Sequence, residues 1–295
     1  MLSNQEIQAL IQLLDDPDEE VYSHVKTKLL DFGTEVIPAL EEVWEHEASF
    51  GLLFQNRIEE ITHEIQFEHV LADLNKWKNS EEQDLLQGVL LIARYQYPDM
   101  DAQAIHKFFD RAVQNIWLEL NNNLTALEKI RIVNHMIFNE ERFSGNTTNY
   151  HAPQNSFINN VVESKKGNPI SLGIVYMVIA QRLNMPVYGV NLPRHFVLAY
   201  ADEYFTAANR IQDSSVMFYI NPFSKGTVFS KKEIEYFIKQ LKLPSMPEFF
   251  QPCTNLDIVI RVCNNLINAY NQLGYLDKVK EIKALQSVLL PDDSK

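Results

Sequence analysis

The chain has 295 residues, enough for one large domain or for two to three small ones. Hydrophobic residues make up 46% and charged residues 22%, which is ordinary for a folded globular protein. The formal net charge of −13 opposes non-specific binding to nucleic acid or to anionic lipid, because both need a basic surface. We therefore expect neither a nucleic-acid nor a membrane partner.

The two cysteines, Cys253 and Cys263, form no disulfide framework, and their spacing does not match a zinc site. The chain begins with a polar amphipathic segment rather than a signal peptide, and no apolar run is long enough to span a bilayer. These features predict a reduced, cytoplasmic protein, for which we expect no metal and no cofactor.

Residues 1–80 have the apolar spacing of successive helices. An Asp-Pro turn at 15–18 separates the first two, an arrangement that resembles one HEAT-type repeat, although an ordinary helical hairpin fits as well. One or two further helices are expected over 50–77. Glu60 and His63 have the spacing of half a di-iron site, but a second half is missing, so a solvated helix face is the better interpretation.

Three more helices are predicted over 81–97, 102–120 and 125–139. The following segment, 139–154, is rich in Gly, Asn, Ser and Thr and is predicted to be a loop. Because it directly precedes the most informative part of the sequence, we expect it to rim a cleft.

That informative part is the stretch 166–200, which predicts a buried helix followed by two strands. Asn168 is a typical N-cap residue, and Pro169 suits the first helical position, where no N–H is needed. Apolar residues cover most of the helix circumference as far as Leu183, so the helix should be buried on most sides. Residues 187–192 and 195–200 have the composition of strands.

Several short motifs in this region resemble the transglutaminase-like superfamily. They are Asn-Ser-Phe at 155–157, Gly-Asn-Pro-Ile-Ser-Leu at 167–172, Pro-Arg-His-Phe at 193–196 and Asn-Pro-Phe at 221–223. More narrowly, they resemble a bacterial branch of the superfamily with a degenerate core and a tetratricopeptide-like tail. The resemblance covers the chain from residue 81 to its end.

The resemblance implies a cysteine nucleophile at the N-terminus of the buried helix, with His195 on the next strand and Asn221 as the residue that orients the histidine ring. Here the nucleophile position falls on Pro169. Ser171 is the nearest hydroxyl, but residues two apart on a helix do not share a face. Thiol chemistry at this site is therefore not expected.

The candidate site residues fall into two groups. Those of a vestigial or altered triad are His195, Asn221 and Ser171, and those of the surrounding pocket are Gly167, Asn168, Pro169, Arg194 and Asn155. A core histidine and an ordinary Asn-Pro turn are the structural alternatives for the first two. Arg194 is either simply solvated or offers its charge to an anionic ligand.

Beyond the site, 202–218 predicts a β-excursion, and Ser230 with Glu233 predicts a capping box at the start of a helix. The Pro-rich segment 243–254 is the clearest boundary. Residues 256–273 and 276–290 then predict a helical hairpin that resembles one tetratricopeptide unit and packs on the core.

The predicted fold is α+β and mainly α, with a small antiparallel sheet of about three to five strands packed on the buried helix. The predicted domains are a HEAT-like region at 1–80, a transglutaminase-like core at 81–243 and the hairpin at 255–291. The favoured function is a non-catalytic module that binds a protein or peptide through a cleft at His195. The alternatives are a hydrolase or acyl-transferase using Ser171, His195 and Asn221, and a small-molecule pocket.

Overall fold

The computed structural model describes residues 4–46, 51–201 and 216–291. The chain forms two compact units, one ending at Lys76 and the other starting at Trp77.

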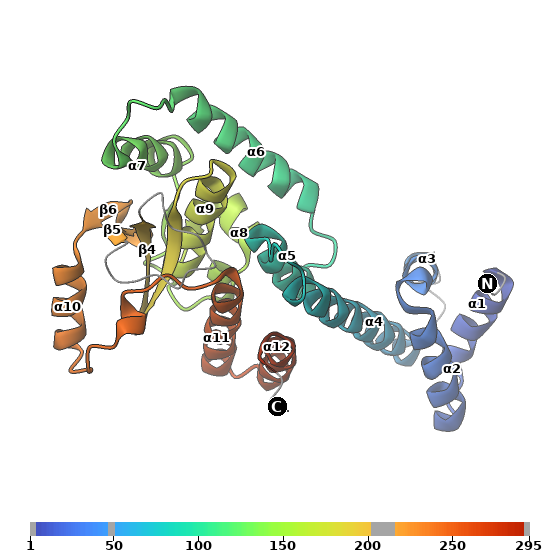
Figure 1. Cartoon of the computed structure of the whole chain (residues 1–295). Coiled ribbons are helices and arrows are strands. Elements are labelled where there is room, and N and C mark those ends of the chain that lie inside the picture. Colours follow the sequence, from blue (N-terminus) through green and yellow to red (C-terminus); the bar gives the residue numbers. More distant parts are fainter. Residues whose placement is uncertain (1–3, 47–50, 202–215, 292–295) are drawn as a thin grey trace. The chain divides into compact units, whose positions relative to one another are not determined.

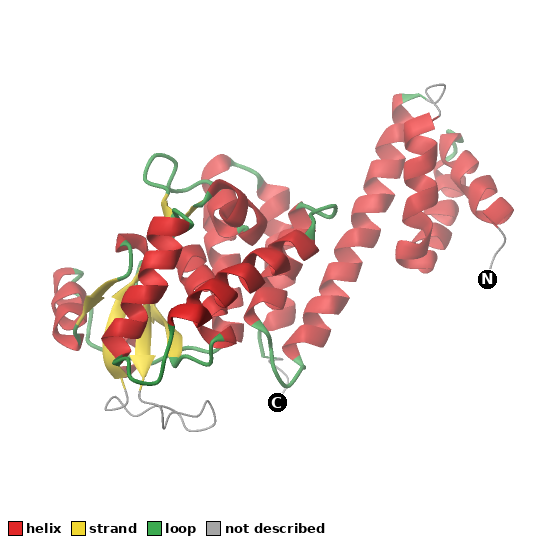
Figure 2. Ribbon diagram, turned by 90° about the horizontal axis from the view of Figure 1, so that it is seen from above, coloured by secondary structure: helices red, strands yellow, loops and turns green. Residues whose placement is uncertain are grey.

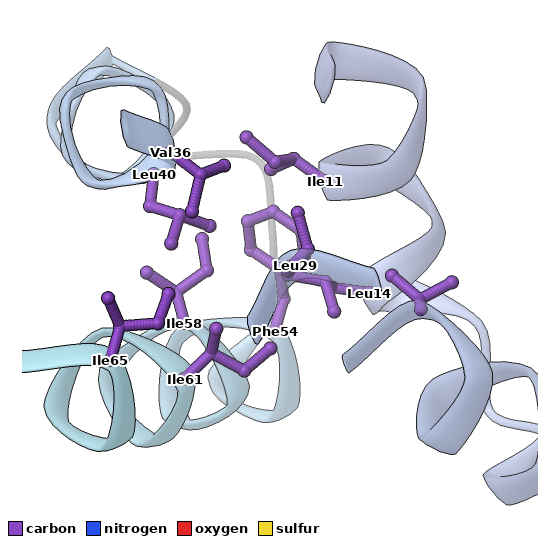
Figure 3. Close-up of a cluster of buried hydrophobic side chains, with 10 residues drawn as sticks. Ile11, Leu14, Leu29, Val36, Leu40, Phe54, Ile58, Ile61 and Ile65 are labelled. Carbon is purple, nitrogen blue, oxygen red and sulfur yellow. The ribbon is translucent and has the colours of Figure 1, made fainter. Parts of the chain in front are cut away.

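The N-terminal unit consists of helices packed around one hydrophobic cluster. Its helices are α1 (Asn4–Gln12), α2 (Glu19–Phe32), α3 (Ile37–His46) and most of α4 (Leu52–Lys78), so one long helix occupies the region where the sequence allowed one or two (Figure 1). Side chains from all four helices and from the short 3-10 turns between them meet in the cluster drawn in Figure 3, which contains Ile11, Leu14, Val25, Leu29, Val36, Leu40, Phe54, Ile58, Ile61 and Ile65.

Arg57 of α4 secures the turn between α1 and α2. Its side chain is only 4% exposed, and its Nη1 donates to the carbonyl oxygens of Leu14 at 2.9 Å and Asp16 at 2.6 Å. Its Nη2 donates to the Glu19 carboxylate at 2.9 Å. A buried guanidinium is tolerated because neighbouring oxygens satisfy its donors. The assignment of this unit to a HEAT-type repeat stays a prediction.

The C-terminal unit combines helices with a small sheet. Its helices after α4 are α5 (Leu85–Gln96), α6 (Ala102–Glu119), α7 (Ala126–Asn134), α8 (Ile158–Ser164), α9 (Pro169–Arg182), α10 (Lys231–Gln240), α11 (Asn255–Leu273) and α12 (Leu276–Leu289). Its strands are β1 (Ser144–Gly145), β2 (Lys166–Gly167), β3 (Val187–Leu192), β4 (His195–Ala201), β5 (Val216–Asn221) and β6 (Thr227–Phe229). Figure 2 shows the longer strands lying together with helices on either side.

The sheet confirms the predicted α+β fold. Four strands follow the order β3-β4-β5-β6, and each neighbouring pair is antiparallel. β4 begins at His195, as the sequence predicts. The predicted β-excursion after β4 lies mostly at 202–215, outside the described residues. The two-residue parallel pair of β1 and β2 was not predicted from the sequence, because it is too short to carry a periodic pattern.

The helix α9 is the centre of this unit. Every residue from Pro169 to Ala180 is buried, in agreement with the apolar circumference of the helix. The ring of Phe196 on β4 packs against two glycines, Gly173 of α9 and Gly189 of β3. A Cβ atom added at either glycine would lie 2.6 Å from this ring. The glycines therefore let the helix and the strands approach closely enough to enclose the phenylalanine.

A polar contact also ties α9 to the far edge of the sheet. The fully buried Tyr176 donates its hydroxyl to Asn134 Oδ1 at 3.0 Å, and Asn134 Nδ2 donates to the Gly226 carbonyl at 2.9 Å. Asn134 ends α7, and a π-helical turn extends the helix expected over 125–139 as far as Glu140.

The C-terminal helices α11 and α12 form the predicted hairpin, turned at Gly274 in a left-handed conformation with φ of 79°. They belong to the same compact unit as the sheet, and Lys78 donates to the carbonyls of Val288 at 2.9 Å and Leu290 at 2.6 Å near the end of α12. Their assignment to a tetratricopeptide unit stays a prediction. Within the described ranges, no helix has the length and apolar character needed to span a bilayer.

We expect Gly173→Ala to destabilise the protein. Overpacking a filled core costs ~1–3 kcal/mol, which exceeds the gain of ~0.5–1 kcal/mol that alanine brings to a helix interior. Urea unfolding measures the change. Gly51→Ala is the matched control, because a Cβ there meets nothing within 4 Å. A Gly173→Ala variant as stable as the parent would show that Phe196 has room to move.

Candidate functional site

The N-terminus of α9 is capped by its own side chains. Asn168 Oδ1 accepts from the backbone N–H of Ser171 at 2.9 Å, and Ser171 Oγ accepts from the backbone N–H of Asn168 at 3.0 Å. This reciprocal pair is a capping box, with Pro169 at the first helical position as predicted. Asn168 Nδ2 also donates to Ser156 Oγ at 2.9 Å. The helix end is therefore already supplied with partners.

The Ser171 hydroxyl is committed to this cap. The side chain is only 1% exposed, and its Oγ also lies 3.2 Å from the Asn168 carbonyl, to which it donates. A Cβ added at Gly167 would lie 2.4 Å from the same oxygen, so the glycine gives the hydroxyl its space. A serine nucleophile must instead be hydrogen-bonded to a base that accepts its proton.

His195 and Asn221 lie together at adjoining strand ends. A hydrogen bond to the Asn221 side chain favours the protonated imidazole, but burial and the positive charge of Arg261 outweigh it and lower the pKa of His195. Asn221 Oδ1 also accepts from the backbone N–H groups of Phe223 at 3.1 Å and Ser224 at 3.2 Å, so this residue is at the same time the predicted turn asparagine.

Arg261 of α11 holds the turn between β3 and β4. Its Nη2 donates to the carbonyls of Leu192 at 2.8 Å and His195 at 2.7 Å, and its Nη1 donates to Asn191 Oδ1 at 3.1 Å. The backbone around His195 is thus fixed by a residue from the C-terminal hairpin. Burial lowers the pKa of Arg261, but an arginine remains charged at neutral pH.

A polar pocket of about 240 Å³ opens beside Pro169. Its wall combines the start of α9, the β3–β4 turn, the 150–152 segment and α11. The lining residues are Tyr150, His151, Ala152, Ser156, Asn168, Pro169, Arg194, Asn265, Asn268, Ala269 and Gln272. Three of the expected pocket residues, Asn168, Pro169 and Arg194, are therefore in the wall.

Two other expected pocket residues, and His195 itself, do not line this pocket. Gly167 lies in β2 beneath the cap. Asn155 is buried and organises the preceding loop: its Nδ2 donates to the carbonyls of Asn149 at 2.7 Å and Tyr150 at 3.0 Å, and its Oδ1 accepts from Asn146 at 2.9 Å. Asn155 therefore holds the backbone at 149–150 in place without lining the pocket itself. Residues 150–152 line the pocket, in line with the expectation that this loop rims a cleft.

The α11 wall was not found by sequence reasoning. Asn265, Asn268 and Gln272 recur at intervals of three and four residues, which places them on one face of the helix. That polar stripe is visible in the sequence, but nothing in the sequence says which part of the core it faces.

A family model described as the transglutaminase-like superfamily matches residues 103–264, more than half of the chain. The chain belongs to this superfamily. The match includes α9, the sheet and the first half of α11, so the elements that build the pocket are mostly part of the transglutaminase-like core.

Several curated proteins are similar over parts of this chain. A UPF0162 protein of Xylella fastidiosa (strain 9a5c) is 28% identical over 210 residues, which cover 68% of this chain and 69% of the relative. A UPF0162 protein of Vibrio cholerae is 24% identical over 181 residues, or 60% of this chain and 63% of the relative. F-box only protein 21 of Mus musculus is 32% identical over 108 residues, or 37% of this chain and only 17% of that protein. No solved structure matches.

Both thiols of this transglutaminase-like chain lie in surroundings that disfavour the thiolate form. Burial raises the pKa of Cys253 and of Cys263 to about 12, so neither is a thiolate at neutral pH. Cys253 Sγ donates to the Gly189 carbonyl of β3 at 3.2 Å, and Cys263 is fully buried in α11.

Glu60, the acidic member of the spacing noted in the N-terminal unit, is engaged in an ion pair. Its carboxylate accepts from Lys26 at 2.7 Å and from the Tyr22 hydroxyl at 3.2 Å. Across the residues that the structure describes, His, Cys, Asp and Glu side chains form no group of three or more suited to a metal ion.

We expect His195 to make the protein less stable in acid. Its folded pKa lies below the ordinary value of 6.5, so the unfolded chain binds the proton first. The contribution to the free energy of unfolding is fully present above about pH 6.5 and is lost as the pH falls below that value. His195→Gln should therefore show a smaller loss of stability between pH 7.5 and pH 5 than the parent.

Urea unfolding at several pH values checks this, together with an NMR titration of the His195 ring. A His195 pKa at or above 6.5, or an unchanged pH slope in the His195→Gln variant, contradicts the expectation.

Proposed function

We propose that this chain is a non-catalytic transglutaminase-like protein that binds a protein or peptide in the pocket beside Pro169. The observation that carries the proposal is the state of the α9 N-terminus. The position where the family resemblance implies a nucleophile holds proline, the neighbouring hydroxyl of Ser171 is consumed by the cap, and a polar pocket is nevertheless open next to both.

The pocket has the properties of a recognition site. Several of its polar side chains, Arg194, Asn265, Asn268 and Gln272, make no hydrogen bond to another side chain or backbone group among the described residues. Polar groups that are left free at a concave surface offer donors and acceptors to a ligand. Their mixture of amides and one guanidinium suits a peptide, whose backbone presents both N–H and C=O groups.

The relatives support the view of a module. F-box only protein 21 shares 108 residues with this chain but is several times longer than that segment. A related segment is therefore used within a larger protein. We also propose a cytoplasmic location, supported by two cysteines that both remain free thiols.

Filling the pocket should abolish peptide binding. Asn268→Trp places a large ring in the pocket from an exposed position on α11, so the fold should tolerate it. The measurement is retention of random-sequence peptides on the immobilised full chain, for the parent and the variant. Asn271→Trp is the matched control, because Asn271 is exposed on the same helix but outside the pocket. Equal retention by all three proteins would overturn the proposal.

Ser171→Ala should lower stability without affecting function. Loss of a capping side chain costs ~1 kcal/mol, and here it also removes the acceptor for the Asn168 N–H. Unfolding measurements should show this loss, while peptide retention at saturating protein concentration stays as in the parent. An ester or amide substrate that leaves an acyl group on Ser171, detected by mass spectrometry, would restore the hydrolase alternative.

A further inference from the structure

We propose that the pocket beside Pro169 recognises a carboxylate, and specifically the free C-terminal carboxylate of a peptide or protein, with Arg194 as its counter-ion. This inference rests on the proposed function and names the chemistry of its ligand.

Arg194 occupies a conformation that favours glycine. It is the second residue of the two-residue turn between Leu192 and His195, and its φ is 60°. A non-glycine residue in this region costs about 1–2 kcal/mol. An arginine placed there lines the pocket, and its guanidinium makes no ion pair within the described part of the chain.

A second positive charge reinforces the first. Arg261 lies behind the same turn, and the partners of its guanidinium are the neutral oxygens of Asn191, Leu192 and His195. The described residues that line the pocket include neither Asp nor Glu, although the whole chain carries 39 acidic residues. The turn therefore presents positive charge to a pocket wall without a carboxylate, within a protein whose net charge is −13.

The amides of α11 complement this charge. Asn265, Asn268 and Gln272 lie along one stripe of the pocket wall, and each offers both a donor and an acceptor. A planar carboxylate can bind the guanidinium through two parallel hydrogen bonds. The amides are then available to the last peptide groups before that carboxylate.

The size and charge of the pocket favour a chain end over other anions. Its volume of about 240 Å³ is below the ~300–1,000 Å³ usual for small-molecule sites, so it takes one or two terminal residues rather than a long segment. A phosphate monoester carries a charge of about −1.5 to −2 and is typically bound by clusters of arginines. Among the described lining residues, Arg194 brings the one guanidinium, because Arg261 uses its donors on the oxygens behind the turn. One guanidinium in the wall can hold a carboxylate through two hydrogen bonds but does not form the arginine cluster typical of phosphate sites.

The test uses two pools of random pentapeptides, one with a free C-terminal carboxylate and one with a C-terminal carboxamide. Each pool is passed over the immobilised full chain, and the retained sequences are resynthesised in both forms for affinity measurement. N-Acetylglycine, a small carboxylate with one peptide group, is the third probe. We expect the carboxylate forms to bind about tenfold tighter or more than the amides, and N-acetylglycine to bind far more weakly than the peptides.

The Arg194→Gly variant tests the contribution of the guanidinium to binding separately from any effect on folding. Because glycine accepts the φ of 60° without strain, this variant should be at least as stable as the parent while losing about tenfold or more in affinity for the carboxylate peptides. Arg142→Gly is the matched control, because Arg142 is also an arginine at positive φ, 59°, but lies outside the pocket. The Arg142→Gly variant should bind the carboxylate peptides with the same affinity as the parent.

The outcomes separate this inference from the proposed function. Equal affinity for both peptide forms, with no effect of Arg194→Gly, overturns the carboxylate inference and leaves peptide binding intact. If N-acetylglycine binds as tightly as the peptides, the assignment of the ligand as a peptide C-terminus is overturned, and a small carboxylate is the ligand instead. If neither pool is retained, both the inference and the proposed function fail.

Discussion

The contact of Phe196 with two glycines is the constraint on which the C-terminal unit depends. A phenyl ring fills the space between α9 and β3 only because Gly173 and Gly189 carry no side chain. Burying such a ring contributes on the order of 2–3 kcal/mol, and it fixes the distance between helix and sheet in a core that is close-packed. The neighbouring residue along β4 is His195, so the same contact also sets the position of the candidate site relative to the start of α9.

The start of α9 combines an ordinary helix N-terminus with a cap made by its own side chains. A helix N-terminus is electropositive and has free N–H groups, which is why it suits a thiolate. Here proline removes one N–H, the Asn168 side chain accepts another, and the Ser171 hydroxyl stabilises the cap from within. The body of α9 is held by packing on all sides, against β3 and β4 of the sheet and against the helices α5, α6, α8 and α11. What remains open to solvent is the polar pocket beside the helix end.

Much of this arrangement could be predicted from the sequence. The cap at Asn168, the buried helix, the strand starting at His195 and the capping box of Ser230 with Glu233 each depend on local patterns, and the structure confirms all four. The helix expected over 125–139 is present, but its last part is π-helical, a detail that the apolar spacing of the sequence does not indicate.

The pocket wall was the harder part to predict. Its α11 side comes from a segment about 100 residues beyond α9, and polar residues on an exposed helix face are equally compatible with simple solvation. The role of Arg261 could not be predicted for the same reason. An arginine in a helix is usually a surface residue, and its carbonyl partners here lie about 70 residues away in the sequence. The sequence identified the residues around Pro169 but not the helix that closes the pocket over them.

The two faces of α11 carry different kinds of constraint. One face is a continuous apolar stripe buried against the rest of the unit, and any change there disturbs packing. The stripe formed by Asn265, Asn268 and Gln272 contributes little to that packing, because these side chains are partly or wholly exposed. Substitutions on this stripe change the lining of the pocket at little cost in folding free energy. The shape and polarity of this wall can therefore diverge between related proteins while their architecture stays the same.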